Sequence, residues 1–403
     1  MTARLSTTGR IGLRDDALSA CVGCGLCLPH CPTYRATGDE RRSPRGRISL
    51  MRIVESGLAE PNAEWLAAMD TCIQCRGCEP ACPSGVPFGE LMADTQAFNS
   101  GTRRLPLRLR LGLRVLGRPQ MLRAGTRLLA LAQRLGFFRS SGFLPGRIPL
   151  RLPRRPTPAE VDVVLFTGCV MDTWTPHVHD AAQRVLEATG ARVGRSGIAA
   201  GCCGALHVHA GLREEARSLA HRVMAALPGD QQVLADSAGC GAMLKEYGDL
   251  LGTEEAHAFS ARVADVHEWL VERLDRLTPF GRRSEPVIIQ DPCHLRHVQR
   301  VDGAMRAVLA PFVPVVELDD EGLCCGAGGA FAVLQPDLAA KVRDQKVAAI
   351  DRAVARSGAA VVVSANPGCS FYLGAAGYQV RHPLEVVAEG LAATGGQEMT
   401  DGN

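Results

Sequence analysis

Two copies of one cysteine motif near the N-terminus constrain this chain of 403 residues more than any other feature. Both copies fit the pattern C-x2-C-x2-C-x3-C-P, ending in Pro32 and in Pro83. In such a motif three thiolates hold one cubane 4Fe-4S cluster, and the fourth turns away to ligate the other cluster. The spacing therefore predicts cluster one on Cys21, Cys24, Cys27 and Cys82, and cluster two on Cys72, Cys75, Cys78 and Cys31.

Structural zinc is the alternative for these cysteines. Zinc sites usually combine two C-x2-C pairs across a longer gap, whereas here three evenly spaced cysteines precede a Cys-Pro pair, twice. This rhythm favours two 4Fe-4S clusters, which in one small domain transfer single electrons and do not by themselves select a substrate.

The other eight cysteines form a second, more dispersed repeat. In the first copy, Cys169 precedes Cys202-Cys203-Gly204 by 33 residues, and Cys240 follows Cys203 by 37. In the second copy, Cys293 precedes Cys324-Cys325-Gly326 by 31 residues, and Cys369 follows Cys325 by 44. Adjacent cysteines seldom bond to each other, so each copy offers four soft ligands, and the glycine lets the backbone approach a bound group. Buried free cysteines are the alternative. We expect further iron–sulfur centres, of open nuclearity, on Cys169, Cys202, Cys203, Cys240 and on Cys293, Cys324, Cys325, Cys369.

Cysteine usage also indicates a compartment. A chain with 46% hydrophobic residues is large enough to build its own core, so sixteen cysteines are not needed as disulfide staples. The first residues lack the apolar stretch of a secretory signal, and no run reaches about 18 apolar residues. We expect a cytoplasmic protein, with peripheral association at the inner face of the cell membrane left open.

An arginine-rich segment divides the chain. No Asp or Glu occurs between Thr95 and Ala159, where fourteen arginines lie; the remaining residues carry a net charge of −11. Prolines interrupt the segment, and the Leu/Arg pattern between them predicts short amphipathic helices. A solvated connector is one interpretation, and a docking surface for an acidic partner or anionic lipid is the other.

After this segment, strand patterns alternate with helical ones, which predicts an α/β fold with parallel sheets. The expected strands are 161–166, 233–237, 287–290, 313–318 and 360–364, and the expected helices are 177–189, 212–227, 256–277 and 336–357. Several cysteines directly follow strands, where α/β sheets bind ligands. The predicted organisation is a helical two-cluster ferredoxin-type domain (1–100), a helical connector (101–158) and two repeated α/β cysteine-rich modules (159–282 and 283–403).

These motifs resemble the iron–sulfur subunits of bacterial glycolate oxidase. The resemblance rests on the paired ferredoxin motifs, Ser43-Pro-Arg-Gly-Arg-Ile48, Ser84-Gly-Val and the two Cys-Cys-Gly modules. It implies a partner FAD-binding subunit that oxidises a 2-hydroxy acid, with electrons leaving through this chain to a quinone or another acceptor. Related proteins include subunits of anaerobic glycerol-3-phosphate dehydrogenase, lactate-utilisation proteins and heterodisulfide reductase.

One departure from the heterodisulfide reductase pattern bears on the chemistry. There the module ends in a C-x2-C pair, but here Met243 and Tyr372 stand at the second position. The missing thiol argues against a thiol–disulfide reductase, although this function stays open as an alternative. It favours a chain that relays electrons and has no catalytic residues of its own.

Other cofactor and partner classes lack their motifs. None of the three lysines lies in a P-loop, and Gly326-Ala-Gly328-Gly-Ala departs from the dinucleotide fingerprint, so we expect no flavin or NAD on this chain. Between Arg103 and Arg155 the only aromatic residues are Phe137, Phe138 and Phe143, which are not interleaved with the arginines and give no platform for stacking on bases, so we expect no nucleic-acid partner.

Overall fold

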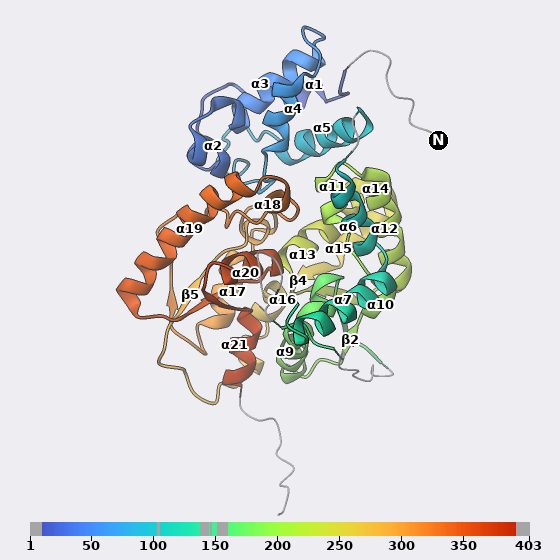
Figure 1. The fold of residues 1–403 in the computed structure, drawn as a ribbon. Helices are drawn as coiled ribbons and strands as arrows, with labels where there is room; N and C mark the ends of the chain where they lie inside the picture. The colour runs from blue at the N-terminus through green and yellow to red at the C-terminus, as the bar shows by residue number, and fades with distance from the viewer. Residues whose placement is uncertain (1–9, 103–104, 138–144, 146, 151–159, 392–403) are drawn as a thin grey trace, which may run out of the picture.

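The computed structural model describes residues 10–102, 105–137, 145, 147–150 and 160–391. Figure 1 shows a helical N-terminal domain above two α/β modules, the first in green and yellow and the second in orange and red. The predicted fold class is confirmed, with a ferredoxin-type domain followed by two repeated modules.

The N-terminal domain consists of short helices around one core. Two of these helices begin at a proline: Pro32 begins the helix after Cys31, and Pro44 begins another behind the N-cap Ser43. Met51, Met69 and Leu91 are fully buried among them. The helices are α1 (Asp15–Ser19), α2 (Pro32–Thr37), the 3-10 helix η1 (Glu40–Arg42), α3 (Pro44–Glu55), α4 (Ala63–Asp70) and α5 (Phe88–Thr102).

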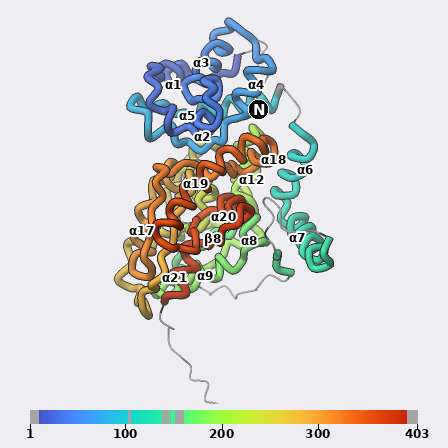
Figure 2. The backbone as a smooth tube through the Cα atoms, turned by 60° about the vertical axis from the view of Figure 1, so that its left-hand side comes forward, coloured from blue at the N-terminus to red at the C-terminus, as the bar shows by residue number. Residues whose placement is uncertain are grey.

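The connector contains the amphipathic helices that the Leu/Arg pattern predicts. They are α6 (Leu107–Leu116) and α7 (Pro119–Arg134), and Figure 2 shows them along one side of the modules. Leu113 of α6 and Leu122 of α7 are buried, so each helix packs one face against the body. Residues 138–144, 146 and 151–159 of the connector lie outside the described residues.

Each module has a four-stranded parallel sheet, and the strand order is the same in both. The first sheet is ordered β2-β1-β3-β4 and the second β6-β5-β7-β8. The shared order confirms the internal repeat inferred from the cysteine intervals. The strands are β1 (Val163–Phe166), β2 (Val193–Arg195), β3 (Gln232–Ala235), β4 (Val263–Asp265), β5 (Val287–Ile289), β6 (Val315–Val316), β7 (Val361–Val363) and β8 (Gln379–Arg381).

Helices connect these strands. In the first module they are α8 (Val170–Trp174), α9 (Pro176–Ala188), α10 (Gly197–Ala200), α11 (Ala205–His209), α12 (Arg213–Ala226), α13 (Ala238–Lys245), α14 (Tyr247–Leu251), α15 (Glu254–Ala261), α16 (Val266–Val271) and η2 (Leu274–Arg276). In the second they are the π-helix η3 (His294–Gln299), α17 (Asp302–Leu309), α18 (Phe331–Leu334), α19 (Pro336–Ser357), α20 (Pro367–Gly374) and α21 (Pro383–Gly390).

The helix predicted over 256–277 is wrong. This stretch contains α15, strand β4, α16 and η2, because Val263 pairs with Val233 and brings the chain back into the sheet. The strands β2, β4 and β8 were also absent from the sequence prediction, because each contains a single β-branched residue, whereas the predicted β5 and β7 consist of valine and isoleucine alone. The five expected strands are present, with shorter bounds.

The modules are packed against each other over one continuous apolar core. Leu165 and Leu270 of the first module and Ile289 and Leu384 of the second belong to this core, and all four are at most 1% exposed. No helix among the described residues is long and apolar enough to cross a bilayer. The shared core fixes the carboxyl ends of the two sheets relative to each other.

Candidate iron–sulfur sites

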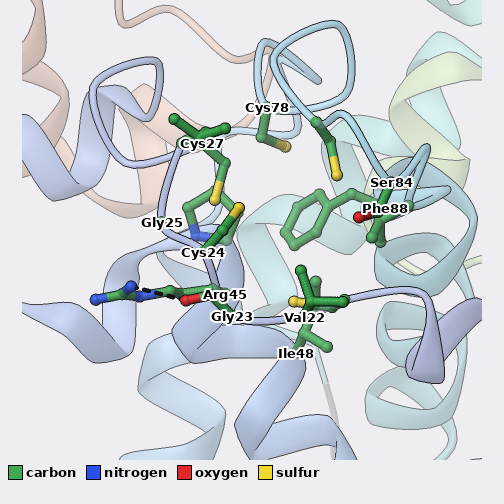
Figure 3. Close-up of a pocket in the computed structure, with 15 residues that line it drawn as sticks. Val22, Gly23, Cys24, Gly25, Cys27, Arg45, Ile48, Cys78, Ser84 and Phe88 are labelled. Atoms are coloured by element: carbon green, nitrogen blue, oxygen red, sulfur yellow. Dashed lines mark hydrogen bonds between the residues drawn. The ribbon is translucent and has the colours of Figure 1, made fainter.

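The two ferredoxin-type motifs line two adjoining hollows, and each hollow takes its last cysteine from the other motif. The first is lined by Cys21, Cys24, Cys27, Cys78 and Cys82, and Figure 3 shows Cys24, Cys27 and Cys78 turned into it beside the Phe88 ring. The second is lined by Cys31, Cys72, Cys75 and Cys78. The fold thus brings Cys82 to the first motif and Cys31 to the second, and Cys78 borders both hollows.

Both motif loops need left-handed backbone on either side of the second cysteine. In the first motif Gly23 and Gly25 supply it, with φ values of 71° and 85°. The second motif places Gln74 and Arg76 there, at 59° and 58°, where a side chain costs on the order of 1–3 kcal/mol. The strain persists only where the surroundings hold such residues in place.

Contacts with the first module hold the strained pair. The Gln74 Nε2 donates to the carbonyl oxygen of His209 at 2.9 Å, and Arg76 forms ion pairs with Glu79 and with Glu246 of the first module. Cysteine spacing gave no signal for either residue. The non-glycine residues at these two positions are the one clue in the sequence.

Arg47 is a second residue that motif analysis missed. It is 1% exposed, and it donates hydrogen bonds to Ala68 O at 2.9 Å and to the hydroxyls of Thr33 and Thr71. Its Nη1 lies 4.0 Å from Cys31 Sγ, so a positive charge without a carboxylate among these partners borders the second hollow. The sequence signal was an arginine on the apolar face of α3, in register with Met51 and Val54.

In each module the four cysteines meet at the carboxyl ends of three neighbouring strands. In the first, Cys169 follows β1, Cys202 and Cys203 follow β2, and Cys240 follows β3. In an order of 2-1-3-4, strands β1 and β3 flank the point where the strand order reverses, which is where open α/β sheets bind ligands. The Sγ atoms of Cys203 and Cys240 lie 3.5 Å apart.

The second module repeats this arrangement. Cys293 follows β5, the Cys324-Cys325 pair follows β6, and Cys369 follows β7. The Sγ atoms of Cys325 and Cys369 are 3.1 Å apart. The structure therefore brings together each predicted set of four thiols.

The glycine after each Cys-Cys pair has a role different from the expected one. Gly204 and Gly326 adopt φ values of 90° and 87°, and their N–H groups donate to the sulfurs of Cys202 at 3.5 Å and Cys324 at 3.4 Å. A Cβ on Gly326 would lie 2.7 Å from Ala339 O in α19. The close approach is therefore to the following helix, and the bond to sulfur stabilises a thiolate.

A cavity of about 450 Å³ lies between the modules, and all eight module cysteines line it. Its other walls are largely apolar, with Trp174 and Phe371 from the modules and Leu109 and Leu113 from α6. His209 and His294 also line it, with stacked rings 5.6 Å apart. Burial lowers the pKa of His209 to about 4, and Arg76 adds to this.

The second ferredoxin-type hollow adjoins the second module. Cys75 packs against the apolar cluster that contains Cys324, Cys325 and Cys369. Burial raises the pKa of the Cys75 thiol, and neighbouring Cys293 raises it further. The four sets of thiols are therefore neighbours in space, in a fixed order. The first hollow with the exposed Cys24 adjoins the second hollow, which adjoins the second module, and the second module shares its cavity with the first module.

The donor set fits iron–sulfur clusters. All sixteen cysteines are free thiols in this structure and can serve as ligands. In both ferredoxin-type motifs, three evenly spaced cysteines precede a Cys-Pro pair, a spacing that suits a cluster better than the paired C-x2-C ligands of structural zinc. Clusters spread their thiolate ligands around a larger core.

A buried ionic pair lies behind the first module's cysteines. His179 Nδ1 and Asp236 Oδ2 are 2.6 Å apart, and both side chains are at most 1% exposed. His382 of the second module bonds through Nε2 to Asp236 O at 2.8 Å. This network joins the modules immediately below Ser237, which lines the cavity.

Comparisons with known proteins agree with this geometry. Residues 17–86 match the family described as 4Fe-4S dicluster domain, and residues 163–245 and 287–374 match the family described as cysteine-rich domain. These matches indicate iron–sulfur clusters in the chain.

Full-length relatives give the same picture. The chain is 34% identical to the glycolate oxidase iron-sulfur subunit of Escherichia coli strain K12, over 97% of this chain and 98% of that protein. It is 31% identical to a probable glycolate oxidase iron-sulfur subunit of Bacillus subtilis strain 168, over 88% of both chains. It is 28% identical to a subunit of the dihydromethanophenazine:CoB--CoM heterodisulfide reductase of Methanosarcina mazei, over 86% of this chain and 87% of that protein.

Proposed function

Because the chain belongs to the family of glycolate oxidase iron–sulfur subunits, we propose that it is the electron-transfer subunit of a flavin-dependent 2-hydroxy-acid dehydrogenase acting on glycolate. A partner subunit with bound FAD oxidises the acid, and this chain passes the electrons on to a quinone or another acceptor. The chain itself binds neither flavin nor NAD. It is cytoplasmic and peripheral at the inner face of the cell membrane.

The succession of four thiol sets supports this proposal best. We assign one 4Fe-4S cluster to Cys21, Cys24, Cys27 and Cys82, a second to Cys72, Cys75, Cys78 and Cys31, and further iron–sulfur centres to the two module sets. Clusters bound there supply one-electron carriers without substrate specificity. The cysteines hold them in sequence from the surface to the apolar cavity between the modules.

The exposed end of this succession is the proposed contact with the flavoprotein. Cys24 is exposed, and two neighbouring apolar side chains, Val22 and Leu26, are 73% and 57% exposed. Exposed apolar side chains beside a redox site are typical of a protein–protein contact. Leu58 is 82% exposed on the same domain and provides a matched control position.

Anaerobic purification, alone and with the FAD-binding partner, tests the proposal. The isolated chain should contain at least about eight irons and matching acid-labile sulfide, and should not oxidise glycolate. The complex should reduce a water-soluble quinone with glycolate as donor. A Val22→Asp/Leu26→Asp variant should keep its iron and lose this activity, whereas Leu58→Asp should retain both. Absence of iron and sulfide, or glycolate oxidation by the isolated chain, would overturn the proposal.

Disulfide reduction is the second candidate, because eight thiols border a cavity large enough for a small disulfide. Against it, the residues three positions after Cys240 and Cys369 are Met243 and Tyr372, both 6% exposed and without a thiol. Turnover of a disulfide with a low-potential electron donor would favour this candidate over electron relay.

A further inference from the structure

Helix α7 has an apolar stripe on the side that faces away from the protein. Its inner face is formed by Leu122, Thr126 and Ala130, which are at most 6% exposed. Half a turn round the helix, the stripe points outward. Its exposed side chains are Met121 (42%), Leu128 (70%), Leu131 (49%) and Leu135 (63%), and Phe137 (75%) follows the helix.

Helix α6 has the same two-sided character. Leu107 and Leu111 are 80% and 56% exposed on its outer side. On its inner side Leu109, Leu113 and Leu116 line the cavity between the modules. The width of α6 therefore separates the cavity from the outer surface at this point. Figure 2 shows both helices on the same flank of the molecule.

All charged residues of α6 and α7 are arginines, so these two helices carry only positive charge. The sequence from Thr95 to Ala159 contains no acidic residue. Arg110, Arg114 and Arg127 are exposed beside the apolar stripe, whereas Arg123 points inward to an ion pair with Asp172 at 2.8 Å that fastens α7 to the first module.

Leucines on one face with arginines along its edges are typical of helices that lie in the interface of an anionic bilayer. We propose that the outer face of α6 and α7 docks on an anionic lipid surface, with the leucines among the acyl chains and the arginines at the phosphate level. This places the α6 wall of the cavity against the bilayer, where a lipophilic acceptor is dissolved. The inference deepens the proposed function by naming the surface that meets the membrane, yet lipid binding is measured without turnover.

Vesicle flotation of the intact, cluster-loaded protein tests this docking. We expect binding to phosphatidylcholine vesicles with about 30% phosphatidylglycerol, weakening as salt shortens the range of the arginine charges, and little binding to phosphatidylcholine alone. Leu128→Gln/Leu131→Gln should weaken binding about tenfold or more, because two exposed leucines no longer leave water. Arg114→Gln/Arg127→Gln should reduce the dependence on phosphatidylglycerol.

Two controls keep the result specific. Leu58→Gln removes a leucine that is more exposed than Leu128 or Leu131 but lies on the ferredoxin-type domain, and it should leave binding unchanged. Equal iron content and electron transfer from the flavoprotein in every variant separate lost docking from lost function. Absence of binding to anionic vesicles, equal binding to neutral ones, or loss of flavoprotein association in the leucine variant with lipid binding intact would overturn the proposal.

Discussion

Replacing Arg47 with glutamine should lower the reduction potential of the second ferredoxin-type cluster and leave the first nearly unchanged. The guanidinium is buried, lies 4.0 Å from Cys31 Sγ, and bonds to a carbonyl and two hydroxyls. Reduction adds a negative charge to a cluster, and an uncompensated cation stabilises the reduced form. Arg47 is therefore expected to raise the reduction potential of the second cluster.

The size of the effect follows from the distance. Two unit charges 4.0 Å apart interact by about 4 kcal/mol at an effective dielectric constant near 20. The added electron is shared over the whole cluster, so a quarter to all of this energy applies, about 1 to 4 kcal/mol. For a one-electron couple this corresponds to a lowering of about 40 to 170 mV.

Arg45 and a lysine variant provide the controls. Arg45 borders the first hollow, but it is 34% exposed and paired with Glu40 at 2.6 Å, so Arg45→Gln should shift that cluster's potential by no more than about 20 mV. Arg47→Lys keeps the charge and should retain most of the potential.

The assay is a redox titration followed by electron paramagnetic resonance, which resolves both clusters. Iron content and unfolding temperature of each variant show whether the domain is intact. An unchanged potential in Arg47→Gln, or equal shifts of both clusters, would refute the electrostatic argument.

Three further predictions follow from the contacts. Cys82→Ala should remove the signal of the cluster held by the first motif, and Cys31→Ala that of the other; the opposite assignment would show that each motif ligates its own cluster. Asp236→Asn should lower the free energy of unfolding by about 3 kcal/mol in urea titrations, because it leaves a buried imidazolium without its partner; a loss below about 1 kcal/mol would contradict this. Burial lowers the pKa of His179, but the neighbouring Asp236 carboxylate outweighs burial and raises this pKa above 6.5. The contribution of His179 to the free energy of unfolding is therefore complete below pH 6.5 and is lost as pH rises through the folded pKa. Burial raises the pKa of Asp236, but His179 outweighs burial and lowers this pKa below 3.8. The contribution of Asp236 to the free energy of unfolding is lost as pH falls through the folded pKa. Gly46→Ala should cost about 2 kcal/mol, read as a lower unfolding temperature, because its Cβ would lie 1.9 Å from a backbone carbonyl oxygen; an unchanged temperature would argue against this crowding.

Local patterns in the sequence account for much of the fold. The two motifs, the proline-started helices after the first motif and the Leu/Arg helices of the connector involve neighbours within a few residues. The repeat of the Cys-Cys-Gly intervals likewise predicted two equivalent modules. Strand β4 was missed because its sequence, Val-Ala-Asp, has a single β-branched residue, and only its pairing with β3 in the folded sheet makes it a strand.

Residues whose role depends on distant partners were also missed. Gln74 bonds to a carbonyl 135 residues later, and Arg76 pairs with a glutamate 170 residues later. Arg47 approaches the second hollow because α3 carries it back across the domain. No spacing rule encodes such contacts, since they arise when separate elements pack.

The sequence by itself identified sixteen cysteines as candidate iron–sulfur ligands, because thiolate spacing along a short loop or after a strand is a local property. The tertiary structure alone decided how the four sets follow one another. Packing of Ile289 and Leu384 against Leu165 and Leu270 turns the two modules toward one cavity. Apolar burial is non-directional along the chain, so only the folded core sets that arrangement.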